Sequence, residues 1–209
     1  MRNKYLTILS EALKRFYVND AKSLFGNNKQ IDERAMVGCI YRYMWNILEQ
    51  QKTLGGQICD IDIDIEYDRM NGCHGDEIKK HMSIVVEHCS KCTHKESCFE
   101  LIKRYMKEDQ KTYDFRPDII LHKRGVCSRG GNFMVVEVKK DNSAAERIKF
   151  DEAKVRYCTC DTAPLRYSIG ATVVLAESGA RVRHFTSKGL CKTFCVHINK
   201  KLSAAHREC

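Results

Sequence analysis

Residues 116–140 constrain the fold of this chain more than any other stretch. They read Arg-Pro-Asp-Ile-Ile-Leu-His, then a glycine-rich turn, then Asn-Phe-Met-Val-Val-Glu-Val-Lys-Lys. The two apolar runs predict a pair of strands joined by a turn, with Asp118 at the start of the first strand. Because a strand alternates its side chains, Glu137 and Lys139 share one face of the second strand. The other face carries Met134, Val136 and Val138.

Two carboxylates and a lysine at one sheet edge suit a divalent metal and a phosphodiester. Phosphodiester hydrolysis needs a nucleophilic water and neutralisation of developing negative charge, and Mg²⁺ or Mn²⁺ held by carboxylates supplies both. We expect Asp118 and Glu137 to hold this ion, with the backbone carbonyl of Val138 as a third ligand. Lys139 would orient or deprotonate the attacking water, or offset charge at the phosphate.

The alternative interpretation is an ordinary hairpin that carries charged residues on its solvent face. Two features favour the functional site. Pro117 gives the first strand a stiff entry, and residues 133–136 are all apolar, as is typical of a central strand buried on both faces. A charge at the end of such a strand is costly unless it is paired or functional.

The N-terminal part of the chain predicts helices. Apolar residues at helical spacing favour one helix over residues 1–26 and a second that begins near Asp32, a plausible N-cap. Glu33 lies on the inward-facing stripe of this second helix, which makes it a candidate site residue. The alternative is an acidic first-turn residue that the helix dipole favours.

The remaining segments indicate an α/β fold with a mixed sheet. Residues 58–67 alternate strictly, so Ile61, Ile63 and Ile65 would face the core and the acidic residues the solvent. Ser143 to Glu146 fits a capping box that begins a helix. Strands are expected at 167–175 and 181–185, and residues from 189 onward are compatible with strand or helix. The helix thus joins two strands as a crossover, which predicts a mixed sheet flanked by helices.

These motifs together resemble the PD-(D/E)xK nuclease superfamily, which has the restriction-endonuclease-like fold. Pro117-Asp118 followed by Glu137-Val-Lys139 matches its central pattern. Further segments resemble small bacterial and phage members, and the likeness spans most of residues 30–176: Glu33-Arg-Ala-Met-Val, Glu66-Tyr-Asp-Arg69, Arg116 to Gly125, and Tyr167-Ser-Ile-Gly-Ala.

The resemblance implies a single domain over residues 1–209, with a core of helix, three strands, helix and strand. It implies that Asp118 and Glu137 carry the metal and that Lys139 is the catalytic lysine. Glu33 matches a helical carboxylate that many members add as a further metal ligand and catalytic residue. Lys154, on the helix after the hairpin, is a candidate contact to the phosphate backbone of the substrate.

A Cys- and His-rich stretch at residues 70–112 departs from the family pattern and predicts an insertion. Cys89, Cys92 and Cys98 can supply three corners of a metal site, with Cys73 or a histidine as the fourth. Zn²⁺ suits a small insertion with few core residues. A [4Fe–4S] cluster is less favoured, because superfamily members that carry one have the cysteines after the nuclease motifs. Unligated thiols are the alternative.

The composition and charge of the chain indicate which binding partners and which cellular compartment to expect. The chain has a formal net charge of +9, which favours a polyanionic partner such as nucleic acid. Its apolar runs are strand-length, so no membrane association is expected, and no export signal begins the chain, which predicts a cytoplasmic protein. The oligomeric state is open, and a homodimer is compatible with the sequence.

The sequence therefore predicts a metal-dependent nuclease that cleaves phosphodiester bonds, with DNA as the expected substrate. Two other functions stay open. One is a catalytically inactive module of the same fold that binds nucleic acid or assembles a complex. The other is a zinc-stabilised interaction protein in which the Cys-rich insertion is the working surface.

Overall fold

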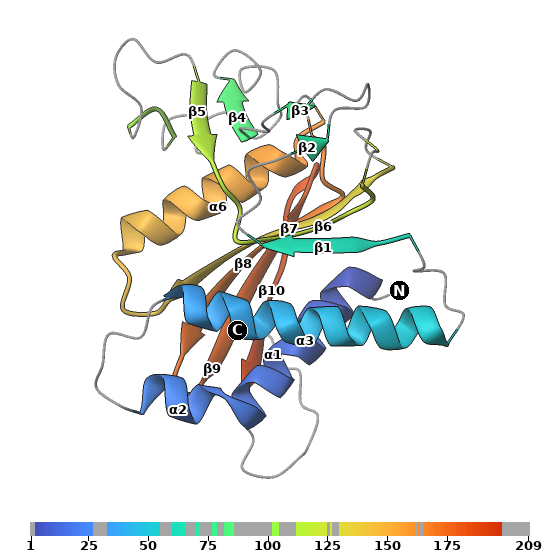
Figure 1. Cartoon of the computed structure of the whole chain (residues 1–209). Coiled ribbons are helices and arrows are strands. Elements are labelled where there is room, and N and C mark those ends of the chain that lie inside the picture. The colour runs from blue at the N-terminus through green and yellow to red at the C-terminus, as the bar shows by residue number, and fades with distance from the viewer. Residues whose placement is uncertain are drawn as a thin grey trace.

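The structure is a computed structural model of the chain (Figure 1). It describes residues 3–26, 33–54, 60–65, 70–71, 77–78, 82–85, 102–104, 112–124, 126, 130–161, 163 and 165–197. Within these residues the central element is a six-stranded mixed sheet with helices on both faces. The predicted α/β class is confirmed.

The sheet has the strand order β1-β6-β7-β8-β9-β10. Neighbouring strands are antiparallel except β7 and β8, which are parallel. The parallel pair is joined by helix α6, as the crossover prediction requires. The strand bounds are β1 Asp62–Ile65, β6 Ile119–His122, β7 Asn132–Lys140, β8 Ile169–Ala176, β9 Gly179–Thr186 and β10 Gly189–His197.

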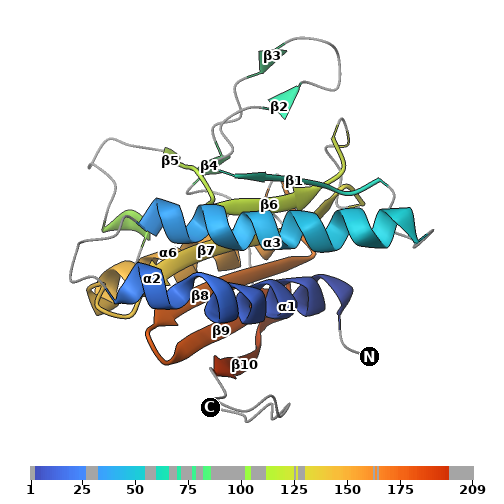
Figure 2. The same cartoon turned by 60° about the horizontal axis from the view of Figure 1, so that its bottom comes forward.

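Helices cover the sheet from two sides. Helices α1 (Lys4–Asn19) and α3 (Glu33–Thr53) lie on one side and α6 (Ala145–Thr159) on the other, as Figures 1 and 2 show. Strand β7 contributes side chains to the cores on both faces of the sheet. Met134 and Val136 are buried in the core under α1 and α3, whereas Val135 is buried in the core under α6. This confirms the prediction of a central strand buried on both faces.

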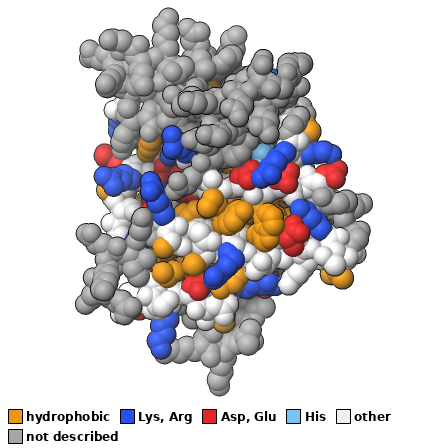
Figure 3. All heavy atoms as spheres, in the orientation of Figure 1, with side chains coloured by type: hydrophobic (Ala, Val, Ile, Leu, Met, Phe, Trp, Pro, Cys, Tyr) orange, Lys and Arg blue, Asp and Glu red, His pale blue; other side chains and the backbone are white. Residues whose placement is uncertain are grey.

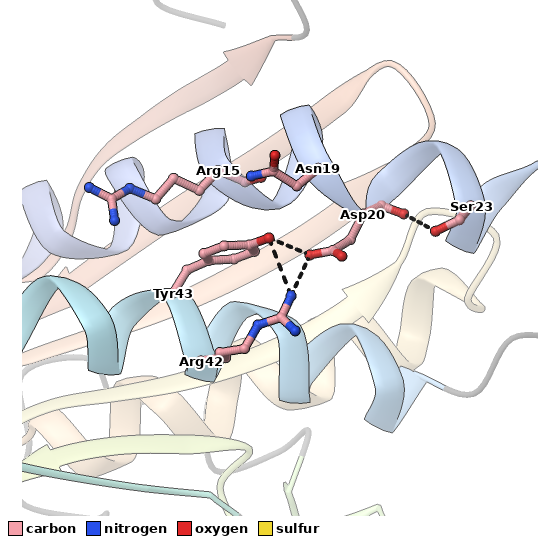
Figure 4. A network of polar contacts seen from close by, with 6 residues as sticks. All are labelled: Arg15, Asn19, Asp20, Ser23, Arg42 and Tyr43. Atoms are coloured by element: carbon pink, nitrogen blue, oxygen red, sulfur yellow. Dashed lines mark hydrogen bonds and ion pairs between the residues drawn. The ribbon is translucent and has the colours of Figure 1, made fainter.

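The N-terminal helix is interrupted, which corrects the prediction of one helix over residues 1–26. Helix α1 ends at Asn19, and a short helix α2 (Ala21–Phe25) follows Asp20. The Asp20 carboxylate accepts hydrogen bonds from Tyr43 Oη at 2.7 Å and from an Arg42 guanidinium N–H at 3.0 Å, both on α3 (Figure 4). These contacts tie the α1–α2 corner to the helix that carries Glu33.

Strand β1 covers only part of the alternating segment 58–67. Its burial also departs from strict alternation. Ile61 and Ile63 are buried, but Ile65 at the end of this edge strand is 43% exposed. The acidic face is not simply solvated, because Asp64 pairs with His122 Nε2 at 2.8 Å and with the Arg124 guanidinium at 2.6 Å. Figure 3 shows acidic and basic side chains next to one another in this region. Such charges protect an exposed sheet edge.

The predicted capping box at the start of α6 is wrong. The helix begins at Ala145, its N-cap is Ala144, and no side chain caps it. Ser143 is held instead in the turn after β7, where its backbone N–H donates to the carbonyl of Lys140 at 3.1 Å. Ser143, which the sequence pattern predicted as the N-cap of this helix, therefore belongs to the preceding turn.

Short strands lie in and beside the predicted insertion. Strands β2 (Met70–Asn71) and β3 (Glu77–Ile78) pair with each other, as do β4 (Met82–Val85) and β5 (Thr112–Phe115). Between β4 and β5, residues 102–104 are described, and Ile102 is buried in the core under α6. The predicted metal ligands Cys73, Cys89, Cys92 and Cys98 all lie outside the described residues.

The C-terminal part completes the sheet. Residues 189–197, which the sequence left between strand and helix, form strand β10 and pair with β9. Cys195 in this strand is disulfide-bonded, whereas Cys39 on α3 is a free thiol. No helix in the described part of the chain is long and apolar enough to cross a membrane.

Candidate active site

Asp118 and the end of β7 are held together by a backbone contact. Asp118 directly precedes β6, and its Oδ2 accepts a hydrogen bond of 2.7 Å from the backbone N–H of Val138. Strands β6 and β7 pair antiparallel with Ile119 opposite Val136. Continuing this register places Asp118 beside Glu137, so the hairpin brings the two predicted carboxylates to one place.

Glu137 and Lys139 face the α6 side of the sheet. The intervening residue Val138 is buried in the opposite core, under α1 and α3, as strand alternation requires. Glu137 is only 3% exposed, although it is a carboxylate. A buried charge of this kind needs compensating partners, which come from helices before and after the hairpin.

The first partner comes from α3. Glu33 begins this helix, and its Oε1 accepts a hydrogen bond from Lys139 Nζ at 2.6 Å. The structure thus brings Glu33 into the predicted site, but in contact with the lysine. The tertiary fold is needed for this pair, because its members are 106 residues apart in the chain.

The second set of partners comes from α6. Lys154 Nζ lies 3.4 Å from Glu137 Oε2 and 2.5 Å from Asp151 Oδ1, and Asp151 Oδ2 lies 3.4 Å from Lys139 Nζ. Acidic and basic groups therefore alternate along one chain of contacts through the site, in the order Glu33, Lys139, Asp151, Lys154 and Glu137.

Asp151 is a site residue that sequence reasoning missed. It is 4% exposed and sits on the sheet-facing side of α6, one turn before Lys154. The sequence did hold a signal for Asp151. Asp151 and Lys154 form a charged pair at i and i+3, next to apolar residues that pack inward, such as Phe150 and Val155. Two charged residues on the apolar stripe of a helix indicate that something on the facing sheet compensates them.

Asp118 and Glu137 are harder to ionise than usual. Burial raises the pKa of Asp118 from its ordinary value of 3.8 to about 6, with nearby Glu33 and Asp151 adding to the rise. Burial also raises the pKa of Glu137 well above its ordinary value, and the charges of Asp118 and Asp151 act in the same direction. Negative charge is therefore in excess at this end of the sheet.

The lysines of the site are held in their charged form. Burial lowers the pKa of Lys139, but Asp151 and the hydrogen bond to Glu33 outweigh this effect, so its pKa is raised overall. Burial likewise lowers the pKa of Lys154, and Glu137 and Asp151 more than offset it. Both ammonium groups are therefore counter-charges for the carboxylates around them.

The donor set fits a hard divalent cation. Four carboxyl groups, from Glu33, Asp118, Glu137 and Asp151, lie near two ammonium groups, and carboxylate oxygens are the ligands that a hard divalent ion prefers. Glu137 Oε1 and Asp151 Oδ2 are buried and have no hydrogen-bond partner in the described part of the chain. Among the same residues, no group of three or more His, Cys, Asp and Glu side chains is arranged ready to hold a metal. The carboxylates are turned toward lysines instead.

Lys154 lies deeper than a substrate contact requires. It is 8% exposed, with its ammonium between Glu137 and Asp151 and 5.2 Å from the centre of the Phe150 ring. The predicted contact to a phosphate backbone therefore has no exposed group to make it. Among the described residues, Arg34, which follows Glu33, and Arg116, two residues before Asp118, are exposed.

Comparison of the chain with protein-family models, with curated proteins and with solved structures found no match. No known family, relative or solved structure therefore indicates a class or a function for this chain.

Proposed function

We propose that this protein is a Mg²⁺- or Mn²⁺-dependent nuclease of the PD-(D/E)xK type, with DNA as its expected substrate. The observation that carries the proposal is the convergence of Asp118, Glu137 and Lys139 at one end of a buried strand pair. The succession α3, β1, β6, β7, α6, β8 supports it, because this is the order of helix, three strands, helix and strand that the resemblance implies.

Asp118 and Glu137 would hold the cation, and Glu33 would join them or act through Lys139. A bound divalent ion would supply a nucleophilic water at neutral pH and would stabilise negative charge on the phosphate. Carboxylates outnumber lysines in the site, and in the described part of the chain Glu137 Oε1 and Asp151 Oδ2 accept no hydrogen bond; both observations support this assignment.

We assign Lys139 to charge stabilisation and orientation of the attacking water. The alternative role, proton abstraction, needs a neutral amine at working pH. The pKa of Lys139 is raised by Asp151 and Glu33 despite burial, so its ammonium stays charged. A fixed positive charge next to the scissile phosphate favours the transition state, where negative charge develops.

Nucleic acid is the substrate class that the charges favour. The chain carries a formal net charge of +9, and the exposed Arg34 and Arg116 flank Glu33 and Asp118 in sequence. Arginine binds phosphate oxygens through a planar fork of donors. These two residues, rather than the buried Lys154, are our candidates for contacts to the backbone of the substrate.

The test is cleavage of supercoiled plasmid, linear duplex DNA and single-stranded RNA with Mg²⁺, with Mn²⁺ and with chelator. Wild type should cleave DNA with either metal and stop in chelator, and Glu137→Ala should be inactive. Lys149→Ala, an exposed residue on α6, is the control and should cleave like wild type. Equal inactivity of wild type and Glu137→Ala on every substrate would exclude the enzyme.

A second candidate is a module of the same fold that binds nucleic acid without cleaving it. One observation favours it: the ammonium groups of Lys139 and Lys154 pair with the carboxylates of Glu33 and Glu137. This candidate predicts salt-dependent DNA binding that persists in Asp118→Ala, without cleavage by either protein.

A further inference from the structure

The contacts of Lys154 are unequal in a way that suggests a second role. Its ammonium lies 2.5 Å from Asp151 Oδ1 but 3.4 Å from Glu137 Oε2. The contact to Asp151 is a short charge-assisted hydrogen bond, whereas the contact to Glu137 is a looser ion pair. Lys154 can therefore give up Glu137 and still keep a buried counter-charge.

Burial gives an internal cation a strong stabilising effect on any ionised carboxylate beside it. Glu137, Asp151 and Lys154 are all buried, and a carboxylate left in this position without a counter-charge is strongly destabilising. Glu137 uses Oε2 for the ammonium, while its Oε1 has no hydrogen-bond partner in the described part of the chain. One oxygen of Glu137 thus already lacks a ligand, and the other is only loosely engaged.

The helix that carries Lys154 is held firmly against the sheet. A methyl group at Gly170 of β8 would lie 2.3 Å from Val155 Cγ1 and 2.9 Å from the Val155 carbonyl oxygen, so α6 packs directly on the strand backbone. The ammonium of Lys154 can therefore shift by side-chain rotation between its two carboxylates while the helix stays in place.

We propose that Lys154 is a built-in counter-cation that holds the place of the divalent ion beside Glu137 in the metal-free protein. A divalent ion at Glu137 would replace the ammonium there, and the ammonium would keep its contact to Asp151. Lys154 thus competes with the metal, and Asp151 favours metal binding by receiving the displaced ammonium. This inference rests on the proposed function only in assigning a divalent ion to Glu137.

The experiment is Mn²⁺ binding by isothermal titration calorimetry at fixed pH, without nucleic acid, on wild type, Lys154→Met and Lys149→Met. Methionine keeps the length of the side chain and removes the charge, and Lys149 is an exposed lysine of the same helix. We expect Lys154→Met to bind Mn²⁺ about tenfold more tightly, which corresponds to about 1.4 kcal/mol, and Lys149→Met to bind like wild type. The melting temperature of Lys154→Met should be lower than that of wild type in chelator and recover in Mn²⁺.

For Asp151→Asn we expect the opposite change in Mn²⁺ affinity. This variant still tests the proposal if Lys154→Met does not fold without metal. Asp151→Asn removes the shortest carboxylate contact of Lys154, so the ammonium should pair more strongly with Glu137, and Mn²⁺ should bind several-fold more weakly than to wild type. Unchanged or weaker Mn²⁺ binding by folded Lys154→Met would overturn the proposal, as would unchanged binding by Asp151→Asn.

The Mn²⁺-binding test of Lys154 and the cleavage test of the nuclease can fail independently. Wild type that binds Mn²⁺ but cleaves no nucleic acid would disprove the proposed activity, and tighter binding by Lys154→Met would still support the counter-cation role. Wild type that cleaves DNA while Lys154→Met binds Mn²⁺ like wild type would overturn the counter-cation alone. No Mn²⁺ binding by wild type would overturn the counter-cation as well.

Discussion

Asp118 accepts a hydrogen bond from the backbone N–H of Val138, the residue that separates Glu137 from Lys139. This contact of 2.7 Å helps to hold Asp118 beside Glu137 and Lys139, because it joins the residue before β6 to the end of β7. It also lowers the pKa of Asp118, although burial raises that pKa more.

The raised pKa of Asp118 predicts an unusual pH dependence of stability in metal-free protein. The folded state holds the Asp118 proton up to about pH 6, whereas the ordinary pKa is 3.8. Stability should therefore fall as pH rises through this window, and Asp118 should contribute a loss of up to about 3 kcal/mol above it. Urea unfolding in chelator between pH 4 and 7 measures this loss.

Asp118→Asn should remove this part of the pH dependence, because the amide does not ionise. Asp141→Asn, at an exposed position in the turn after β7, is the control and should follow wild type. Identical pH profiles for Asp118→Asn and wild type would contradict the assignment of the loss to Asp118.

Asp64 should show the opposite sign. Burial raises its pKa, but hydrogen bonds from His122 and Arg124 outweigh burial and lower the pKa overall. Its stabilising effect is therefore present at neutral pH and is lost as pH falls below 3.8 toward the folded pKa. Asp64→Asn should cost about 1–3 kcal/mol at pH 7 and progressively less in acid. Guanidinium unfolding at pH 7 and pH 3 tests this, and an equal cost at both values would refute it.

Lys139→Met should reduce cleavage by about 10²–10³-fold, because it removes a charge that favours the transition state. The measurement is single-turnover cleavage at saturating Mn²⁺, with Lys149→Met as the matched control on the same substrate. Lys139→Arg keeps the charge and should recover part of the rate. If Lys139→Met cleaves as fast as the control, Lys139 has no catalytic role.

Gly170→Ala should destabilise the protein by about 1–3 kcal/mol, because its methyl group would overlap Val155 of α6 and force the helix off the sheet. Gly38→Ala is the matched comparison, since a methyl group at this position in α3 meets no atom within 4 Å. It should stabilise by up to about 1 kcal/mol through helix propensity. Thermal unfolding of both variants gives the test, and destabilisation of equal size in both would show that close packing at Gly170 is not the cause.

Much of the fold was predictable because it depends on local alternation. The run from Phe133 to Val136 predicted a central strand, and the paired apolar runs predicted the β6–β7 hairpin. The predicted helix over 1–26 and the cap at Ser143 were wrong, because contacts from α3 to Asp20 and a turn hydrogen bond to Lys140 decided those positions. Local propensity does not include such contacts.

The sequence by itself determined the face and the spacing of Glu137 and Lys139, because strand alternation fixes which side chains share a side. It also marked Asp118 and Glu33 as candidates, through position in a strand pair and on a helix stripe. Only the tertiary structure decided that Glu33 contacts Lys139, that Lys154 is buried beside Glu137, and that Asp151 belongs to the site. These contacts join segments far apart in the chain, and the packing of α3 and α6 around β7 brings them together.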